Sequence, residues 1–373
     1  MPLRHLPVLD GLRAVAILLV LWCHIPVGTA NYPEWLKVAH GVIGPGGLGV
    51  DIFFVLSGFL ITRILLREKE QGAPVRWFLL RRVLRIFPIY YLLLLVMAIA
   101  KPSIELAWCA AYLSNLHWIL EPKLVRSMGH TWSLCVEEHF YLLWPLVVAF
   151  TPRVVSKWSI VLVLAPVALL CAYWMNVHYA SLGAPPSEAM EAVQHASPVR
   201  FLSLGCGALL AYVEPAIVAS PRRFVLLALA LLVPALWLHP IVHYLLLPEW
   251  LATTPTIPWQ HIPSAWIVHS SCLCTAILLF CLTLGDLRWS PLRVLHSRIL
   301  RGIGRISYGL YLYHLPINGL WFYGNLTWVN AGLALATTFA VATVSYFVLE
   351  RPILRFGARL GKKPQSGTVT TTT

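Results

Sequence analysis

A histidine and an arginine share one face of the first long apolar stretch of the sequence. His24 lies eleven residues after Arg13. Eleven helical steps of about 100° return to the same side of a helix, roughly 16 Å further along its axis. A neutral imidazole can accept the proton of a hydroxyl group, and a guanidinium group can bind an anion. Each residue alone is explained by a structural role, but the pair on one apolar face predicts a polar path through this stretch.

Three arginines stand at helical spacing before a later apolar run. Arg81, Arg82 and Arg85 crowd one side of the expected helix, because residues three and four apart are neighbours. Planar guanidinium groups suit bidentate binding of a diphosphate. Arginines at a membrane surface also bind lipid head groups, and the sequence leaves both interpretations open.

A carboxylate enters the fifth apolar run one helical turn from two hydroxyl side chains. Glu137 lies four residues after Ser133 and four residues before Tyr141. These spacings predict a hydrogen-bonded polar patch. A carboxylate of this kind can fix the tautomer of a histidine and stabilise its charged form. We therefore expect Glu137 to orient His24.

Polar side chains form a stripe on the tenth apolar run, at positions i, i+1, i+4 and i+7 of a helix. Aromatic stripes usually serve packing, but a histidine inside the span favours a cavity lining. His314 and Tyr308 are therefore candidates for lining the site. The stripe consists of Ser307, Tyr308, Tyr311 and His314.

The second apolar run contains a further carboxylate, Asp51, near its start. It could cap the helix, form an ion pair or serve function, and the sequence does not decide between these roles. Ser57 and Gly58 in the same run predict close contact with another helix, because small residues let two backbones approach.

The composition indicates that a membrane protein positions these groups. Hydrophobic residues make up 58% of the 373 residues and charged residues only 12%, against roughly 25% charged residues in soluble domains. Lysine and arginine outnumber aspartate and glutamate by 28 to 15, yet they lie between apolar runs, as in cytoplasmic loops. We therefore expect no nucleic-acid partner. The eight cysteines lack zinc-site spacing, and we expect no metal and no permanently bound cofactor.

The apolar runs predict an all-α polytopic bundle, since about 20 apolar residues cross the hydrocarbon core. Run 104–120 is thin and polar, and if it does not cross, 23 of the 28 basic residues fall on one side of the membrane. We therefore predict ten spans rather than eleven, with both termini cytoplasmic. Residues 1–363 form one membrane domain, and the polar tail 364–373 is expected to be disordered. The runs are 11–28, 47–66, 86–100, 104–120, 134–151, 158–177, 198–213, 224–246, 265–285, 304–322 and 330–349.

These segments, in this order, resemble the acyltransferase-3 family of membrane O-acyltransferases over nearly the whole chain. Six collinear motifs make the match specific. The departure from the pattern is Glu138-His139, where Glu-Gln is expected. The motifs are Leu-Asp-Gly-Leu-Arg-Ala with the histidine that follows it, Gly-Val-Asp-Ile-Phe-Phe-Val-Leu-Ser-Gly-Phe-Leu at 49–60, Arg82-x-x-Arg85, Trp132-Ser-Leu-x-x-Glu137, Ile306-Ser-Tyr-Gly-Leu-Tyr-Leu-Tyr-His314 and Glu350-Arg-Pro352.

The resemblance implies a donor, a base and an acceptor. In that family the histidine that maps onto His24 is regarded as catalytic, and the pair that maps onto Arg82 and Arg85 is implicated in donor binding. The implied donor is acyl-CoA, with acetyl-CoA expected, and the implied acceptor is a hydroxyl-bearing glycan or small molecule. We expect the donor phosphates to dock on these arginines and Arg81, and the thioester to pass Arg13 toward His24.

Many members of that family carry a fused extracytoplasmic hydrolase-like domain. We see none in this sequence, and we expect either direct transfer or a separate extracytoplasmic partner enzyme. The expected location is a bacterial inner membrane.

A proton-coupled transporter or exporter is the rival interpretation, because it would also bury histidine, glutamate and arginine within spans. The two halves of the sequence lack the matching broken helices that many transporters show. Release of CoA distinguishes the two functions.

Overall fold

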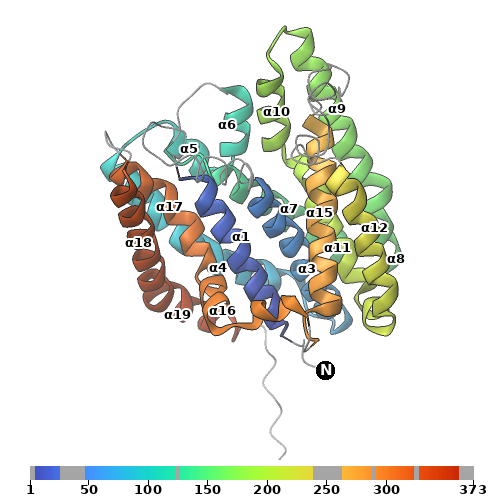
Figure 1. Cartoon of the computed structure of the whole chain (residues 1–373). Coiled ribbons are helices and arrows are strands. Elements are labelled where there is room, and N and C mark those ends of the chain that lie inside the picture. Colours follow the sequence, from blue (N-terminus) through green and yellow to red (C-terminus); the bar gives the residue numbers. More distant parts are fainter. Residues whose placement is uncertain are drawn as a thin grey trace, which may run out of the picture.

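The structure is a computed structural model that describes residues 5–25, 47–121, 127–237, 263–287, 290–322 and 327–360. Throughout these ranges the regular structure is helical, without a strand (Figure 1). Seven continuous helical runs in them are long and apolar enough to cross a membrane, which confirms the predicted all-α membrane architecture. They are α3 (Gly47–Glu70), α4 (Val75–Ala100), α7 (Thr131–Phe150), the run of α8 (Arg153–Ser159), η1 (Ile160–Leu164) and α9 (Ala165–Ser181), α11 (Ser197–Ala219), α15 (Pro263–Leu284), and the run of α18 (Trp328–Ser345), η4 (Tyr346–Glu350) and α19 (Arg351–Gly357).

Three shorter apolar helices lie among these runs, namely α1 (Pro7–Cys23), α12 (Pro221–Trp237) and α17 (Ser307–Trp321). If they also cross, the described residues contain ten spans. The number of spans and the orientation stay predictions. We call the end of the bundle where α1 begins and α19 ends the lower face, and the opposite end the upper face (Figure 1). The predicted tail 364–373 lies outside the described residues. The remaining helices are α5 (Glu105–Ala110), α6 (Ser114–Leu120), α10 (Pro186–His195), η3 (Pro291–His296) and α16 (Arg298–Arg305).

The thin apolar run 104–120 does not form one continuous helix. It folds into α5 and α6, of 6 and 7 residues, and Tyr112 between them has a left-handed φ of 54°. Neither helix is long enough to cross the hydrocarbon core. This break supports the interpretation that the segment does not span the membrane.

Two helices extend beyond the apolar runs 47–66 and 86–100 that predict them. Helix α3 continues to Glu70 and α4 begins at Val75, so only a short turn joins them. The apolar pattern ends where the side chains become charged. The helix itself continues, because long charged side chains can extend to polar surroundings. The three clustered arginines therefore lie within α4 itself.

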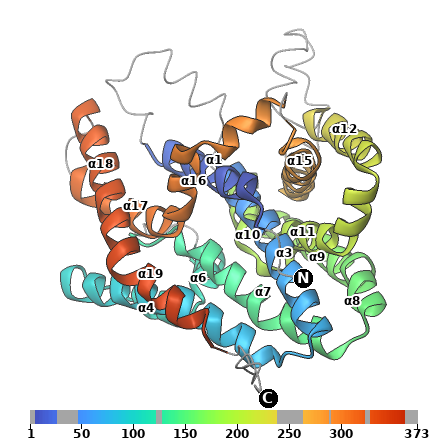
Figure 2. The same ribbon diagram turned by 90° about the horizontal axis from the view of Figure 1, so that it is seen from below.

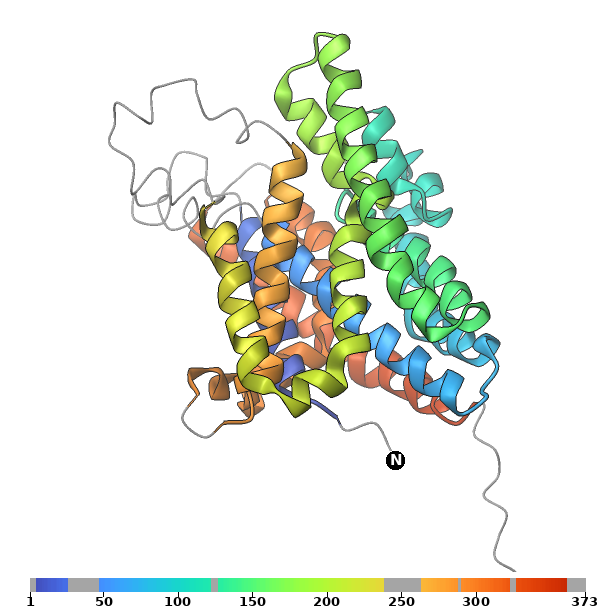
Figure 3. The same cartoon turned by 90° about the vertical axis from the view of Figure 1, so that its right-hand side faces the viewer.

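Helix α3 occupies the middle of the bundle, packed on α1 and on α11. A Cβ added at Gly58 would lie 1.8 Å from the backbone oxygen of Leu204, and one at Gly207 would lie 1.9 Å from that of Val55. The close helix contact predicted at Gly58 is thus confirmed. On the outer flank, α15 packs between α11 and α12, and α9 packs on α11 (Figure 3).

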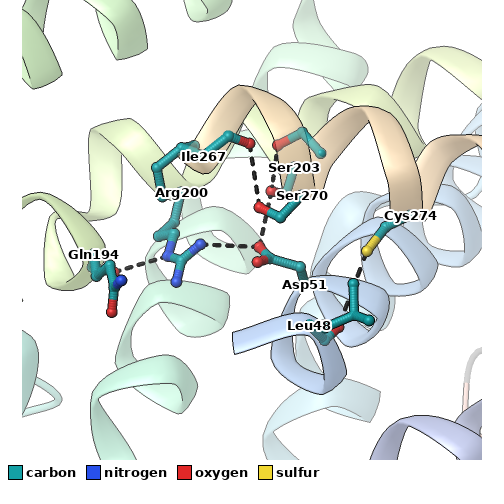
Figure 4. Close-up of polar contacts among 9 residues, drawn as sticks. Leu48, Asp51, Gln194, Arg200, Ser203, Ile267, Ser270 and Cys274 are labelled. Carbon is teal, nitrogen blue, oxygen red and sulfur yellow. Dashed lines mark hydrogen bonds and ion pairs between the residues drawn. The ribbon is translucent and has the colours of Figure 1, made fainter. Parts of the chain in front are cut away.

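A buried ion pair ties α3 to α11 (Figure 4). Arg200 Nη1 donates to Asp51 Oδ1 at 2.9 Å, and the two side chains are only 1% and 0% exposed. Ser203 donates to the same carboxylate oxygen, and Arg200 Nε donates to the backbone oxygen of Gln194. The guanidinium group also lies 5.2 Å from the ring centre of Trp132 on α7. Asp51 therefore forms a structural contact that joins three helices.

Arg200→Ala should lower the free energy of unfolding by about 3–5 kcal/mol, because it leaves the buried carboxylate of Asp51 without its counter-charge. Thermal unfolding of the purified variant in one detergent measures this loss. The double variant Asp51→Asn with Arg200→Met removes both charges at similar volume, and we expect it to lose much less. A double variant as unstable as Arg200→Ala would contradict the ion-pair explanation.

Candidate active site

A cavity of about 180 Å³ lies in the centre of the bundle, between α1, α3, α4, α7 and α17. We call it the arginine cavity. Its wall contains three guanidinium groups and two carboxylates, together with hydroxyl and aliphatic side chains. The charged residues are Arg13, Arg82, Arg85, Glu137 and Glu138.

The guanidinium groups of the arginine cavity form few polar contacts with other side chains. Arg85 has no hydrogen bond or salt bridge among the described residues. Arg82 lies over two aromatic rings, with its guanidinium carbon 5.3 Å from the centre of Phe78 and 5.7 Å from that of Tyr141. Only Arg13 reaches a carboxylate, with 3.3 Å between Nη1 and Asp10 Oδ1. Positive charge in this cavity is therefore available to an anionic ligand.

Arg81 differs from the other two arginines of its run in its partner and in the cavities that it lines. Arg81 pairs with Glu68 at the end of α3 and does not line the arginine cavity. It lines a second cavity of about 170 Å³ between α4 and α19. Arg82 and Arg85 line both cavities, so only their side chains and Ile64 are shared between the two walls. All three arginines therefore meet in the cavity between α4 and α19, whereas only Arg82 and Arg85 also line the arginine cavity.

Glu137 lies in the wall of the arginine cavity, whereas the sequence predicted that it would orient His24. Its carboxylate accepts hydrogen bonds from Ser57 at 2.8 Å and from Tyr141 at 3.1 Å, within the wall of the arginine cavity. No hydrogen bond between Glu137 and His24 is found in the described ranges. The physical reason is depth, because Glu137 lies further down α7 while His24 follows the upper end of α1. The predicted hydrogen bond between Tyr141 and Glu137 is confirmed. The predicted contact between Ser133 and Glu137 is wrong, because the Ser133 hydroxyl bonds to the backbone oxygen of His130 and to the hydroxyl of Tyr311.

His24 sits directly after α1 with one ring nitrogen held by the backbone. Its Nδ1 lies 2.8 Å from the backbone oxygen of Val20 and 3.2 Å from the sulfur of Cys23. A carbonyl oxygen can only accept, so Nδ1 carries the hydrogen and Nε2 is the unprotonated nitrogen of the neutral ring. Asn318 on α17 donates to the backbone oxygen of His24 and fixes the end of α1.

Three histidines lie side by side at this level of the bundle, and we call them the histidine row. The ring centres of His24 and His314 are 4.8 Å apart, and those of His314 and His130 are 5.0 Å apart. His314 Nδ1 and His130 Nε2 donate to the backbone oxygens of Tyr311 and Leu312. Their other ring nitrogens are buried without a hydrogen-bond partner among the described residues. Within the part of the chain that the structure describes, no group of three or more histidine, cysteine or acidic side chains is arranged to hold a metal ion.

Sequence reasoning did not identify His130. The residue precedes the Trp132-Ser-Leu-x-x-Glu137 motif by two positions, and this proximity was the available signal. Its approach to His314 joins residues 184 positions apart and follows only from the fold.

The histidine row stands between two cavities. On one side Tyr311 lines the arginine cavity and lies 5.6 Å, centre to centre, from the ring of His314. Tyr308 lines the same cavity and donates to the backbone oxygen of Ile86. On the other side His24 lines a cavity of about 1400 Å³ between α4, α17 and α18, which we call the lateral groove. The site thus has a narrow cationic chamber and a wide apolar one, separated by imidazole groups.

Comparison with known proteins gives a consistent result. The model of the acyltransferase domain family (Acyl_transf_3) matches residues 6–350. The chain is 30% identical to the peptidoglycan O-acetyltransferase OatA of Listeria monocytogenes, and 30% identical to the putative peptidoglycan O-acetyltransferase YrhL of Bacillus subtilis. It is 26% identical to the O-acetyltransferase OatA of Staphylococcus aureus. Each alignment covers 95% of this chain but only 56–58% of the relative, so the chain spans little more than half of their length. No solved structure matches.

Proposed function

We propose that this chain, which belongs to the acyltransferase domain family, is a membrane O-acyltransferase that moves an acyl group from acyl-CoA to a hydroxyl of a glycan. Acetyl is the proposed acyl group because the relatives are named as O-acetyltransferases. A glycan is the proposed acceptor because two of those names specify peptidoglycan. Long apolar helices make the chain an integral membrane protein, and a bacterial inner membrane is its proposed location.

The observation that carries the proposal is the arginine cavity next to the histidine row. Guanidinium groups bind phosphate oxygens bidentately, which suits the phosphates of a CoA donor. Arg82 and Arg85 line both the arginine cavity and the cavity beside α19, at the lower part of α4. We place the donor phosphates at these two side chains. The thioester arm then extends past Arg13 toward Tyr311, next to the histidine row.

His24 is the proposed base. Its Nε2 is unprotonated because Nδ1 is held by Val20, and the side chain lines the lateral groove where the acceptor has room to bind. Nε2 takes the proton of the acceptor hydroxyl, and the oxygen attacks the thioester carbonyl carbon. The carbon–sulfur bond breaks, and the CoA sulfur leaves with the electron pair and is then protonated. An acyl group carried transiently on His24 is the other route that this position allows.

His314 and Glu137 take supporting roles in this scheme. His314 contacts the ring of His24 and is itself anchored to the backbone of Tyr311, so it restricts the orientation of the base. Glu137 stays in the wall of the arginine cavity, where its carboxylate lies among the guanidinium groups. We therefore propose that Glu137 shapes the donor site and not the orientation of His24.

Purified protein in lipid nanodiscs, incubated with acetyl-CoA and a methyl N-acetylhexosaminide, tests the proposal. We expect release of free CoA thiol that depends on the sugar, together with an acetyl ester on the sugar. A proton-coupled exporter releases no CoA, so the absence of both products would contradict the acyltransferase assignment. Thiol release without an acetylated sugar would point to hydrolysis of the donor and would also count against it.

A further inference from the structure

Tyr112 stands at the break between α5 and α6 in a backbone conformation that bulky residues rarely adopt. Its φ of 54° is left-handed, and within the described ranges no other residue except glycine has a positive φ. Such a conformation costs free energy and persists only where surrounding contacts enforce it. The position of Tyr112 is therefore imposed by its neighbours.

Contacts with α4 and α7 hold Tyr112 in this conformation. His139 Nε2 of α7 donates to the backbone oxygen of Tyr112 at 3.0 Å, and His139 Nδ1 lies 2.8 Å from the hydroxyl of Ser197. The Tyr112 ring stacks on Phe87 and Tyr90 of α4, with ring centres 5.2 and 4.7 Å apart. Seen from below, α4 and α6 lie beside α7 (Figure 2). Backbone and ring are both fixed, so the hydroxyl of Tyr112 has a defined place inside the bundle.

Two polar groups in this region lack a hydrogen-bond partner. Tyr112 is only 8% exposed, and its hydroxyl forms no hydrogen bond within the part of the chain that the structure describes. The same holds for the buried Oε1 of Glu138, a residue of α7 that lines the arginine cavity. Tyr112 lies within electrostatic reach of Glu138 and of Tyr308, which also lines this cavity. The two unpartnered groups therefore lie together at one side of the arginine cavity.

The adjacent carboxylate shows how a buried acid of this wall is satisfied by the protein itself. Glu137 accepts a hydrogen bond from Ser57 through Oε1 and one from Tyr141 through Oε2. Buried polar groups nearly always have a partner, and leaving one without a partner costs free energy. Glu138 offers an acceptor and Tyr112 a donor, and no hydrogen bond joins these two in the described ranges. A secondary amide satisfies both, because its N–H donates and its oxygen accepts.

The position of Glu138 along α7 matches the position of the amides in the arm of acyl-CoA. Glu138 lies between Tyr141 and Ser133 on this helix. The ring centre of Tyr141 is 5.7 Å from the guanidinium carbon of Arg82. Ser133 hydrogen bonds to Tyr311, beside the histidine row. Glu138 is therefore between the proposed phosphate position and the histidine row, as the two amides of CoA are between its phosphates and its sulfur.

We propose that Glu138 and Tyr112 bind a secondary amide of the acyl-CoA arm. The carboxylate of Glu138 accepts the amide N–H, and the hydroxyl of Tyr112 donates to the amide oxygen. The terminal torsion of a glutamate is broad, so a small rotation turns its free oxygen toward a ligand in the cavity. This inference rests on the proposed function and names the part of the donor that this wall recognises. The pair then distinguishes CoA thioesters from acyl donors that lack such an amide.

Two donor analogues test the inference, each with one of the two amide N–H groups of acetyl-CoA replaced by an ester oxygen. Equilibrium binding to the purified full chain in lipid nanodiscs is measured without an acceptor. Wild type should bind one analogue about tenfold or more weakly than acetyl-CoA, because a hydrogen bond to a charged group is lost. Glu138→Leu should bind acetyl-CoA and that analogue within about twofold of each other, since it lacks the acceptor for the N–H. Glu138→Gln keeps an acceptor oxygen and should restore part of the discrimination.

Tyr112→Phe removes only the hydroxyl and leaves the ring stack in place. Without donor this variant should be at least as stable to heat as wild type, because its hydroxyl has no partner to lose. It should bind acetyl-CoA and both analogues about two- to tenfold more weakly than wild type does, since an ester keeps the carbonyl oxygen. Tyr90→Phe is the matched control in the same stack. The Tyr90 hydroxyl donates to the backbone oxygen of Cys109 at 2.9 Å, so its loss should lower thermal stability and leave the discrimination between donors unchanged.

Three results would overturn the inference while leaving the donor site in place. Wild type could bind both analogues as tightly as acetyl-CoA, or the loss with one analogue could persist in Glu138→Leu, which would put the amide elsewhere. Tyr112→Phe could unfold at a lower temperature with unchanged donor affinity, which would make the hydroxyl structural. Absence of acetyl-CoA binding to the wild type would instead reject the proposed function.

Discussion

His24→Ala should reduce acyl transfer per folded molecule by about a hundredfold or more, the low end for loss of a positioned general base. The alanine has no nitrogen to take the proton of the acceptor hydroxyl, whereas the arginine cavity on the far side of the histidine row is unchanged. Turnover at saturating donor and the affinity for acetyl-CoA should be measured on the same preparation. We expect the affinity for the donor to stay near that of wild type.

Two comparisons separate this role from a structural one. A base must be neutral to accept a proton, so wild-type turnover should fall toward acidic pH, and the residual activity of His24→Ala should lose this dependence. His314→Ala should cost less turnover, because His314 contacts the base and does not line either cavity. If His24→Ala unfolds at lower temperature while its folded fraction turns over normally, His24 is structural and His314 becomes the next candidate.

The sequence predicts best what depends on spacing along one helix. The spacing of Arg13 and His24 predicts one shared helix face. The structure places Arg13 on α1 in the wall of the arginine cavity and His24, directly after α1, in the wall of the lateral groove. Arg82 and Arg85 likewise meet in one cavity. Arg81 departs from its neighbours because Glu68, on the preceding helix, offers it a partner. That contact depends on the turn between α3 and α4, which an apolar pattern does not reveal.

The sequence pattern does not predict contacts between distant helices. His130 joins the histidine row from the start of α7, and Arg200 pairs with Asp51 across 149 positions. Arg200 stands near the start of α11, and its side chain is buried and pairs inside the bundle. Each of these residues is polar in an apolar environment, so its presence indicates a partner without naming it. Only the packing of α3, α7, α11 and α17 supplies the partner.

Arg82→Ala combined with Arg85→Ala should weaken acetyl-CoA binding by roughly a hundredfold to ten-thousandfold. Each hydrogen bond to a charged group contributes about 1.5–3 kcal/mol, and two are lost. Equilibrium binding of acetyl-CoA to the purified protein measures the effect directly and does not depend on the acceptor. Replacement of both residues by lysine should restore only part of the affinity, because lysine keeps the charge but loses the bidentate fork.

Arg81→Ala is the matched control, because it removes a guanidinium group from the same run of α4. Arg81 pairs with Glu68 and lies outside the arginine cavity, so its removal should change donor affinity far less than the double variant does. A lipid head-group site would treat the three arginines alike, since all three lie near the lower end of one helix. If the folded double variant binds acetyl-CoA as tightly as wild type, the arginine cavity does not hold the donor phosphates. If Arg81→Ala weakens binding as much as the double variant, the phosphates lie instead in the cavity between α4 and α19.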